Sequence, residues 1–210
     1  MSLVLHYAPG TCALASHIAL KEAGAVYEAR QVDFKAGEQR SPAYLAVNPK
    51  GRVPALQTDR GVLTESPVIL GYIAQTYPDA KLAPNGDSFA FGDLQAFNMW
   101  ISASLHPAFA HLFRPERYVD GEDHQAAVRE KCRALVADHF ALAESTLFRG
   151  PWAYGDTYTI ADPYLFTMTL WLSRTPGLPP LETYPRIANH FARMNAREAV
   201  RKVLAVHAGG

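Results

Sequence analysis

The stretch LVLHYAPGTCALASHIALKEAG, residues 3–24, decides the fold. Its apolar start, residues 3–7, followed by a Pro-Gly pair, predicts a buried strand that ends in a tight loop. Apolar residues then recur at helical spacing over residues 12–23, and Gly24 supplies a helix stop. Residues 27–32 regain extended character, so the chain opens as strand, helix, strand. That order predicts an α/β domain, with a right-handed crossover if the strands are parallel.

A second pattern of strands occupies residues 48–64. Turn formers lead into residues 55–58 and, after an Asp-Arg-Gly turn, into residues 62–64, which together predict a hairpin. Residues 66–77 follow with apolar side chains on one helical face, and a proline ends them. The predicted order of elements is therefore βαβ and then ββα.

Beyond this point the strand signals disappear. We expect residues 1–79 to form the α/β domain, the polar and turn-rich residues 80–87 to be a linker, and residues 88–210 to form an all-helical domain. The predicted helical segments are residues 88–112, 125–147, 160–173 and 184–205.

The composition favours a globular protein with a small-molecule partner. Hydrophobic residues make up 49% of the 210 residues and charged residues 19%, which is enough to bury a core. Twenty basic residues balance twenty acidic ones, and this zero net charge argues against nucleic acid or a membrane as partner. Two cysteines are too few for a disulfide framework. With no membrane span or leader peptide recognisable, we expect a cytoplasmic location.

Cys12 is the first candidate for chemistry. It opens the first helix, where free backbone amides and the positive end of the helix dipole favour a thiolate, although a cysteine there can also be a small packing residue. Ala15 stands three places on, so a Cys-x-x-Cys redox pair is absent and a mixed disulfide with a small thiol is the natural chemistry. Cys132 lies between Val128 and Leu135 at helical spacing, which indicates core packing.

Two further positions suggest a site for a peptide-like ligand. Pro54 begins a strand but cannot donate to a ladder, and a cis bond there would leave the amide and carbonyl of Val53 free to pair with an extended peptide. Ser66, followed by Pro67, is expected to be a helix N-cap. Capping does not account for Glu65, whose carboxylate beside free helix amides suits the ammonium and carboxylate of an amino-acid-like group.

Four motifs occur in a fixed order: YAPGTCALASH at residues 7–17, NPKGRVPAL at 48–56, TES at 64–66 and TIAD at 159–162. Together they resemble the cytosolic glutathione transferases of the bacterial beta class over nearly the full chain. The resemblance implies an N-terminal thioredoxin-like domain, a C-terminal helical bundle, a homodimer, and glutathione as co-substrate with no metal.

The resemblance also assigns residues that bind glutathione. Cys12 matches the family's cysteine near the glutathione sulfur. Val53 and Pro54 match its backbone contact and its cis-proline. Glu65 and Ser66 match the pair that holds the γ-glutamyl end.

More residues are assigned around the sulfur and at the far end of the ligand. His106 matches the family's histidine on the first helix of the second domain and becomes the second catalytic candidate, although a helical histidine is otherwise more often structural. Lys35 resembles a lysine that meets the glycine end of glutathione. Phe109, Leu112 and Phe113 follow His106 at helical spacing, which fits either an apolar electrophile pocket or core packing.

Some positions depart from the family or have alternative roles. Ser102 and Ser104 stand where relatives commonly carry a carboxylate that reaches across the dimer, so the cross-subunit contact is left open. Tyr7 ends the first strand, where other classes place a thiol-activating tyrosine, and beside Cys12 we interpret it as a buried aromatic. Residues 159–162 resemble the family's helix-capping signature, which we assign to folding.

The expected function is transfer of the glutathione thiolate to small apolar electrophiles, as in detoxification. One alternative is a glutathione-dependent thiol-disulfide oxidoreductase or peroxidase with Cys12 as nucleophile. Another is a non-catalytic carrier of glutathione or apolar ligands. The sequence does not identify the physiological electrophile.

Overall fold

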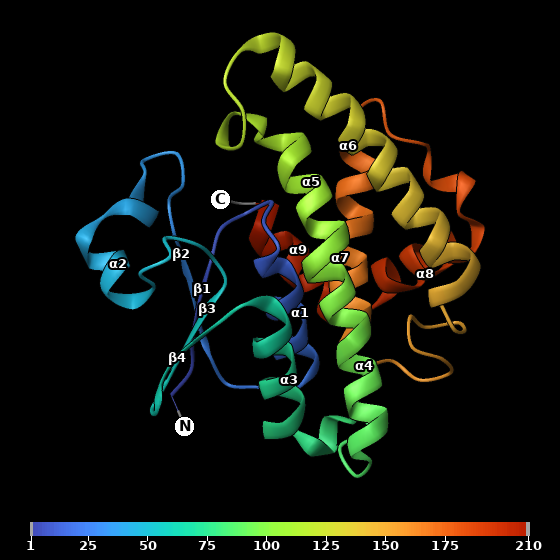
Figure 1. Ribbon diagram of the computed structural model, residues 1–210. Coiled ribbons are helices and arrows are strands. Elements are labelled where there is room, and N and C mark those ends of the chain that lie inside the picture. The colour runs from blue at the N-terminus through green and yellow to red at the C-terminus, as the bar shows by residue number, and fades with distance from the viewer. Residues whose placement is uncertain (1, 209–210) are drawn as a thin grey trace.

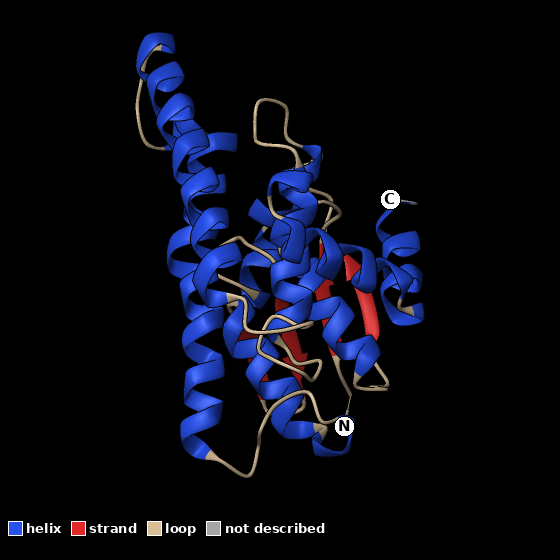
Figure 2. Cartoon of the chain, turned by 90° about the vertical axis from the view of Figure 1, so that its right-hand side faces the viewer, coloured by secondary structure: helices blue, strands red, loops and turns tan. Residues whose placement is uncertain are grey.

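The computed structural model describes residues 2–208 and places a small four-stranded sheet beside a larger group of helices (Figure 1). The strands lie in the order β2-β1-β3-β4. Their bounds are Val4–Tyr7 for β1, Glu28–Gln31 for β2, Ala55–Thr58 for β3 and Gly61–Thr64 for β4. Seen from the helical side, the helices stand in front of the strands (Figure 2).

The sheet has the predicted connections. β1 pairs in parallel with β2 through the crossover helix α1 (Ala13–Glu22), and β3 pairs antiparallel with both β1 and β4. Helix α3 (Ser66–Thr76) follows the hairpin. The βαβ and ββα order, and with it the α/β class of the N-terminal half, is confirmed.

One element escaped prediction, the short helix α2 (Pro42–Val47). Ser41 caps it by accepting a hydrogen bond from the Tyr44 amide at 3.1 Å, and Tyr44 is its one buried residue. Six residues with a single buried side chain carry no measurable helical period, so the hydrophobic pattern could not reveal it.

All of the secondary-structure elements between Ser88 and Ala208 are helices, which confirms the all-helical second half. The α-helices are α4 (Ser88–Trp100), α5 (His106–Phe113), α6 (Glu122–Leu142), α7 (Ala161–Arg174), α8 (Pro185–Ala196) and α9 (Glu198–Ala208). π-helical turns cover Ile101–Leu105 and Ala143–Leu147, and 3-10 turns cover Glu38–Arg40, Pro78–Ala80, Pro115–Arg117 and Leu181–Thr183. The placement of a linker at residues 80–87 stays a prediction. Within residues 2–208, no helix is both long enough and apolar enough to cross a bilayer.

The prediction of one helix over residues 184–205 is wrong. Arg197 has an extended backbone, with φ −72° and ψ 134°, and it separates α8 from α9. This break lets α9 pack against α1, near the sheet (Figure 1). A single helical period continued through both segments, so the pattern gave no sign of the turn.

Helix α7 forms the central wall of the helical half, because ten successive residues from Ala161 to Leu170 are buried. Its start is fixed by Asp162, which accepts hydrogen bonds from the amides of Thr159 at 2.6 Å and Ala153 at 2.8 Å. The Thr159 hydroxyl accepts the amide of Ala161 at 3.3 Å. The capping role predicted for the TIAD motif is confirmed.

A pair of histidines, the buried His17 and the partly buried His207, joins α9 to α1. His17 Nδ1 and His207 Nε2 lie 3.1 Å apart, and the ring of Tyr7 packs on both, with centroids 5.2 and 4.8 Å away. The Tyr27 ring meets His17 edge-on at 5.6 Å. Burial lowers the pKa of both imidazoles to about 4, and for His17 the facing His207 and then Lys21 lower it further. Tyr7 is 4% exposed, which confirms its interpretation as a buried aromatic.

Acid should therefore release α9. A released imidazole has its ordinary pKa near 6.5, so the stability from this contact is complete above pH 6.5 and is lost as the pH falls toward 4. Amide exchange of residues 198–208 should be measured as a function of pH and corrected for intrinsic rates. The equilibrium constant for opening of α9 should increase by up to about 100-fold for each unit by which the pH falls, because His17 and His207 each bind a proton on opening. His207→Gln should flatten this dependence, and His124→Gln, at an exposed site on α6, should keep it. Equal protection at pH 7 and pH 4.5 would contradict the assignment.

Candidate functional site

Four of the predicted glutathione residues, Val53, Pro54, Glu65 and Ser66, lie with Cys12 where the loop before α1, the turn before β3 and the start of α3 come together. The Val53–Pro54 peptide is cis, as the resemblance implied. The Cys12 thiol donates to the Val53 carbonyl at 3.6 Å, and the nearby Ser66 side chain lowers the pKa of the same thiol. Residues more than 40 positions apart in the sequence are thus brought to one point.

A tight turn over residues 8–11 places Cys12. The Thr11 hydroxyl donates to the Ala8 carbonyl at 2.7 Å and accepts the amide of Ala13 at 3.3 Å, which joins the turn to the start of α1. Gly10 has φ +72°, a left-handed conformation that favours glycine. The turn predicted from the Pro-Gly pair therefore places Cys12 at the position just before the first residue of α1.

The expectation of a thiolate at Cys12 is wrong for this structure. Burial raises the pKa of the thiol to about 11, and the Ser66 hydroxyl and the cation of Arg52 offset this only in part, while Glu65 adds to it. The physical reason is burial: the backbone amide of Cys12 itself also lowers the pKa of the thiol, but burial outweighs it, and the sulfur is hydrogen-bonded to the Val53 carbonyl. At neutral pH Cys12 is therefore a thiol that donates a hydrogen bond.

Glu65, not Ser66, occupies the N-cap of α3, so the predicted capping role of Ser66 is wrong. Ser66 is instead the first helical residue, and its hydroxyl is free to face the sulfur of Cys12. Glu65 has φ +73°, a strained conformation for a non-glycine residue of the kind found at ligand sites. Its carboxylate pairs with Lys50, whose ammonium also donates to Thr64 at 2.6 Å.

His106 follows directly on the π-helical turn Ile101–Leu105. Such turns change the direction in which the next side chains point and are frequent at functional sites. Burial, and next the cation of Arg52, lower the pKa of His106 to about 4, so its imidazole is neutral at pH 7. Arg52 and Glu65 affect both His106 and Cys12, which shows that the two catalytic candidates share one electrostatic environment.

Two residues of α7 also belong to this region, and the sequence did not reveal them. The Trp171 indole donates to the Gly10 carbonyl at 3.1 Å, and its ring faces His106. Tyr164 is 1% exposed, and Ser102 and Ser66 are near enough to its hydroxyl to act on its pKa. Burial, followed by the influence of Cys12, holds the pKa of this phenol well above its usual value. Both aromatics read as core positions in a buried helix, so no sequence signal set them apart.

Not every predicted residue reaches the site. Lys35 is exposed after β2, and its amide donates to Asp33 at 2.9 Å. Within residues 2–208 no hydrogen bond or ion pair joins its side chain to the other candidates, and its assignment stays a prediction. Phe109 and Leu112 are buried in the core at 0% and 5% exposure, whereas Phe113 is 42% exposed. Of the three electrophile candidates, Phe113 is thus the one that presents a large surface.

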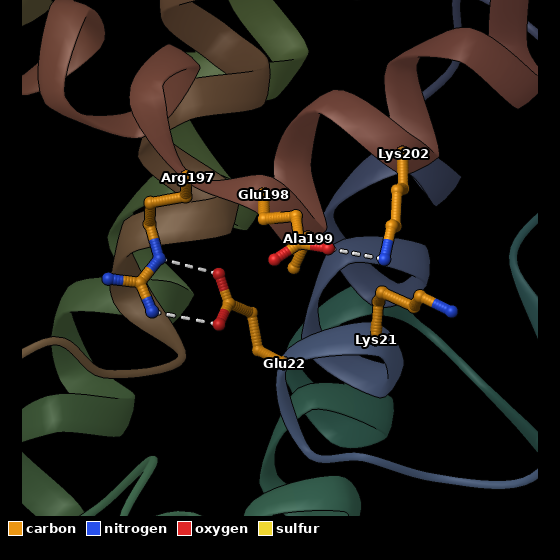
Figure 3. A pocket seen from close by; sticks show the side chains of 6 residues that line it. All are labelled: Lys21, Glu22, Arg197, Glu198, Ala199 and Lys202. Atoms are coloured by element: carbon orange, nitrogen blue, oxygen red, sulfur yellow. Dashed lines mark hydrogen bonds and ion pairs between the residues drawn. The ribbon is translucent and has the colours of Figure 1, made fainter.

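Two cavities lie away from these residues. The larger, about 480 Å³, is lined by Lys21, Glu22, Arg197, Glu198, Ala199 and Lys202 (Figure 3). Arg197 binds Glu22 through two hydrogen bonds of 2.5 and 2.8 Å, and Lys202 pairs with Glu198, so most of the charges around the opening are already paired. The smaller cavity, about 370 Å³, is lined by Thr58, Arg60, Gly61, Val62, Leu63 and Tyr72. Neither contains a predicted catalytic or glutathione residue.

The sequence matches the glutathione S-transferase N-terminal domain over residues 1–75 and the C-terminal domain over residues 100–198. It is 36% identical to glutathione S-transferase GstA of Escherichia coli over 95% of this chain and 96% of that one. The chain belongs to the glutathione S-transferase family. The predicted family, the fold class and the assignment as an enzyme of this kind are confirmed.

Solved structures agree with this assignment. A glutathione transferase homologue from Sulfitobacter with bound glutathione is 34% identical, has a TM-score of 0.91 and covers 98% of both chains. The beta-class glutathione S-transferase of Sphingomonas chungbukensis is 33% identical, with a TM-score of 0.84, over 97% of this chain and 98% of its own. A sphingomonad glutathione S-transferase in complex with glutathione is 32% identical, with a TM-score of 0.84, over 99% and 100%.

Cys12 should alkylate slowly in the ligand-free protein. With a pKa of about 11, a fraction of about 10⁻³ of the thiol is ionised at pH 8, against about a quarter for an unperturbed cysteine of pKa near 8.5. In a Cys132→Ser background, the rate of iodoacetamide labelling should rise tenfold per pH unit up to at least pH 10. The same protein in denaturant serves as the control and should reach its plateau near pH 9. A native plateau below pH 8 would show that the thiolate is stabilised after all.

Proposed function

We propose that this protein conjugates glutathione to small apolar electrophiles, as a beta-class enzyme of detoxification. The observation that carries the proposal is the meeting of Cys12, the Val53 backbone and Ser66 beside the start of α3. Relatives of 32% and 34% identity contain bound glutathione in their solved structures, which supports glutathione as the substrate here.

Glutathione would lie extended along the backbone of Val53 and pair with it in strand fashion. Its γ-glutamyl carboxylate would meet Ser66 and the free amides at the start of α3, where the helix dipole favours an anion. Its ammonium would meet Glu65, which Lys50 binds in the free protein. The glycine end would point toward the basic side chain of Lys35.

The reaction needs a glutathione thiolate beside Cys12 and His106. The Cys12 thiol, once its S–H turns from the Val53 carbonyl to the ligand, and the neutral His106 would both donate a hydrogen bond to that sulfur, which would lower the pKa of the glutathione thiol. The thiol loses its proton to solvent, and its sulfur lone pair forms the new bond to the electrophilic carbon as the leaving group departs with its electrons. Phe113 and Trp171 provide the partly exposed aromatic surface nearest to His106 for an apolar electrophile.

The same geometry bears on the oxidoreductase alternative. Attack by Cys12 on a glutathione-linked disulfide requires its thiolate, and the raised pKa of Cys12 makes that species scarce at pH 7. The hydrogen-bond role of Cys12 in conjugation does not require its ionisation. We therefore rank conjugation above thiol-disulfide exchange, and both above a non-catalytic carrier.

We also propose that the protein works as a cytoplasmic homodimer. Large apolar side chains are exposed along the adjoining elements β4, α3 and α4, namely Val62, Val68, Phe89 and Met99. Phe89 is 84% exposed, which is costly for a monomer in water. Both cysteines are free thiols, which suits a reducing compartment.

The variant Cys12→Ala separates the proposed activities. Loss of one hydrogen bond to a charged sulfur costs about 1.5–3 kcal/mol, so conjugation of a chlorinated nitroaromatic should fall by a factor of about 10 to 160 but persist. Reduction of a glutathione mixed disulfide should disappear, because it needs the sulfur of residue 12. Cys132→Ala is the matched control and should keep both activities.

Equal loss of both activities in Cys12→Ala would favour the oxidoreductase, and calorimetric glutathione binding without turnover would favour the carrier. Absence of binding at millimolar glutathione would refute the proposal.

The dimer is tested at Phe89. A charge at this position should oppose burial of the apolar surface, so Phe89→Asp should sediment as a monomer of about 23 kDa while the native protein sediments at twice that mass. Phe113→Asp, on a different helix, should leave the mass unchanged. A native protein that stays monomeric at micromolar concentration would disprove the dimer.

A further inference from the structure

We propose that Trp171 is a positioning residue that fixes the loop of Cys12 relative to the helix of His106. Its indole N–H hydrogen-bonds the loop at Gly10, and its ring packs against the imidazole of His106. The inference rests on the proposed function for its importance in catalysis, but its structural content is measurable without any turnover.

The first observation is the hydrogen bond between the two halves of the chain. Trp171 Nε1 donates to the Gly10 carbonyl at 3.1 Å, two residues before Cys12. Within residues 2–208 no other hydrogen bond reaches this carbonyl. The φ of +72° at Gly10 belongs to the turn that delivers Cys12 to α1, so the bond acts on the conformation that sets the position of the sulfur.

The second observation is that the indole ring of Trp171 packs against α5. The ring meets His106, Phe109 and Phe113 edge-on, with centroid distances of 5.2, 5.5 and 5.6 Å. These residues lie on one face of α5, and Phe109 is wholly buried, so the ring is held by a fixed support. A rigid side chain that touches the loop at one end and His106 at the other fixes their separation.

The third observation separates this role from ordinary packing. Residues 161–170 of α7 are all buried, whereas Trp171 directly after them is partly exposed. It therefore lies at the border of the core and faces the candidate site. Burial is the largest cause that lowers the pKa of His106, and the Trp171 ring packs edge-on against the imidazole, so loss of the ring should raise this pKa toward its ordinary value.

Two variants of the full chain separate the two contacts. Trp171→Phe keeps an aromatic ring but removes the N–H, and a neutral hydrogen bond is worth about 0.5–1.5 kcal/mol, so amide exchange of residues 8–12 should rise about 2- to 10-fold. The pKa of His106, followed by NMR of labelled histidine, should stay low in this variant. Trp171→Leu removes both contacts, and the pKa of His106 should then rise above its native value toward 6.5, while the Arg52 cation still holds it below that value. Trp100→Phe, which changes an aromatic that packs on Phe97 and His139, should alter neither.

The kinetic signature should be a fall in kcat with little change in KM for glutathione, because within residues 2–208 no hydrogen bond or ring contact joins Trp171 to a residue assigned to hold the ends of the tripeptide. Unchanged loop exchange in Trp171→Phe overturns the proposal, whatever the activity. So does a His106 pKa that is unchanged in Trp171→Leu, and if that variant does not fold, the loop exchange of Trp171→Phe decides. Both shifts observed in a protein that does not bind glutathione would uphold the positioning role and refute the proposed function.

Discussion

The arrangement depends on how α7 is started and held. The buried carboxylate of Asp162 accepts the amides of Thr159 and Ala153 and faces His190 at 2.9 Å, so its negative charge is met from three directions. A carboxylate at 0% exposure is stable only with such partners. Because α1 packs on α7 through a shared apolar cluster with Leu14, this cap sets where α1 lies and, through it, where Cys12 lies.

That placement explains why burial outweighs the helix dipole at Cys12. A helix N-terminus contributes about 0.3–1 kcal/mol to a nearby anion at an exposed site, which is less than one pKa unit. Removing a thiolate from water beside a carbonyl costs more, and the pKa of Cys12 rises to about 11. The result is a proton donor next to the Val53 carbonyl, and His106 provides a second neutral donor. Two neutral donors suit an anionic sulfur brought in by the substrate.

The sequence was informative where a feature depends on neighbouring residues, and less so where it depends on packing between distant ones. The strands, the Pro-Gly turn, the cap at residues 159–162 and the meeting of Cys12 with Val53 followed from periodicity, from turn chemistry and from motifs. The break at Arg197 and the direction of the Cys12 sulfur did not, since neither leaves a trace in the hydrophobic pattern. Trp171 is a similar case, because its partner Gly10 lies 161 residues away.

The ion pair between Lys50 and Glu65 shows how the free site is prepared for a zwitterionic ligand. Both side chains are about half exposed, at 46% and 58%, and exposed pairs contribute only about 0–1 kcal/mol. The pair therefore holds Glu65 in place at φ +73° without a large barrier to exchange. A ligand ammonium that replaces Lys50 regains the same attraction, and the ligand carboxylate beside it meets the amides at the start of α3. Lys50 then keeps its hydrogen bond to Thr64 and stays partly exposed to water, so the site gains a charged ligand without leaving a buried cation.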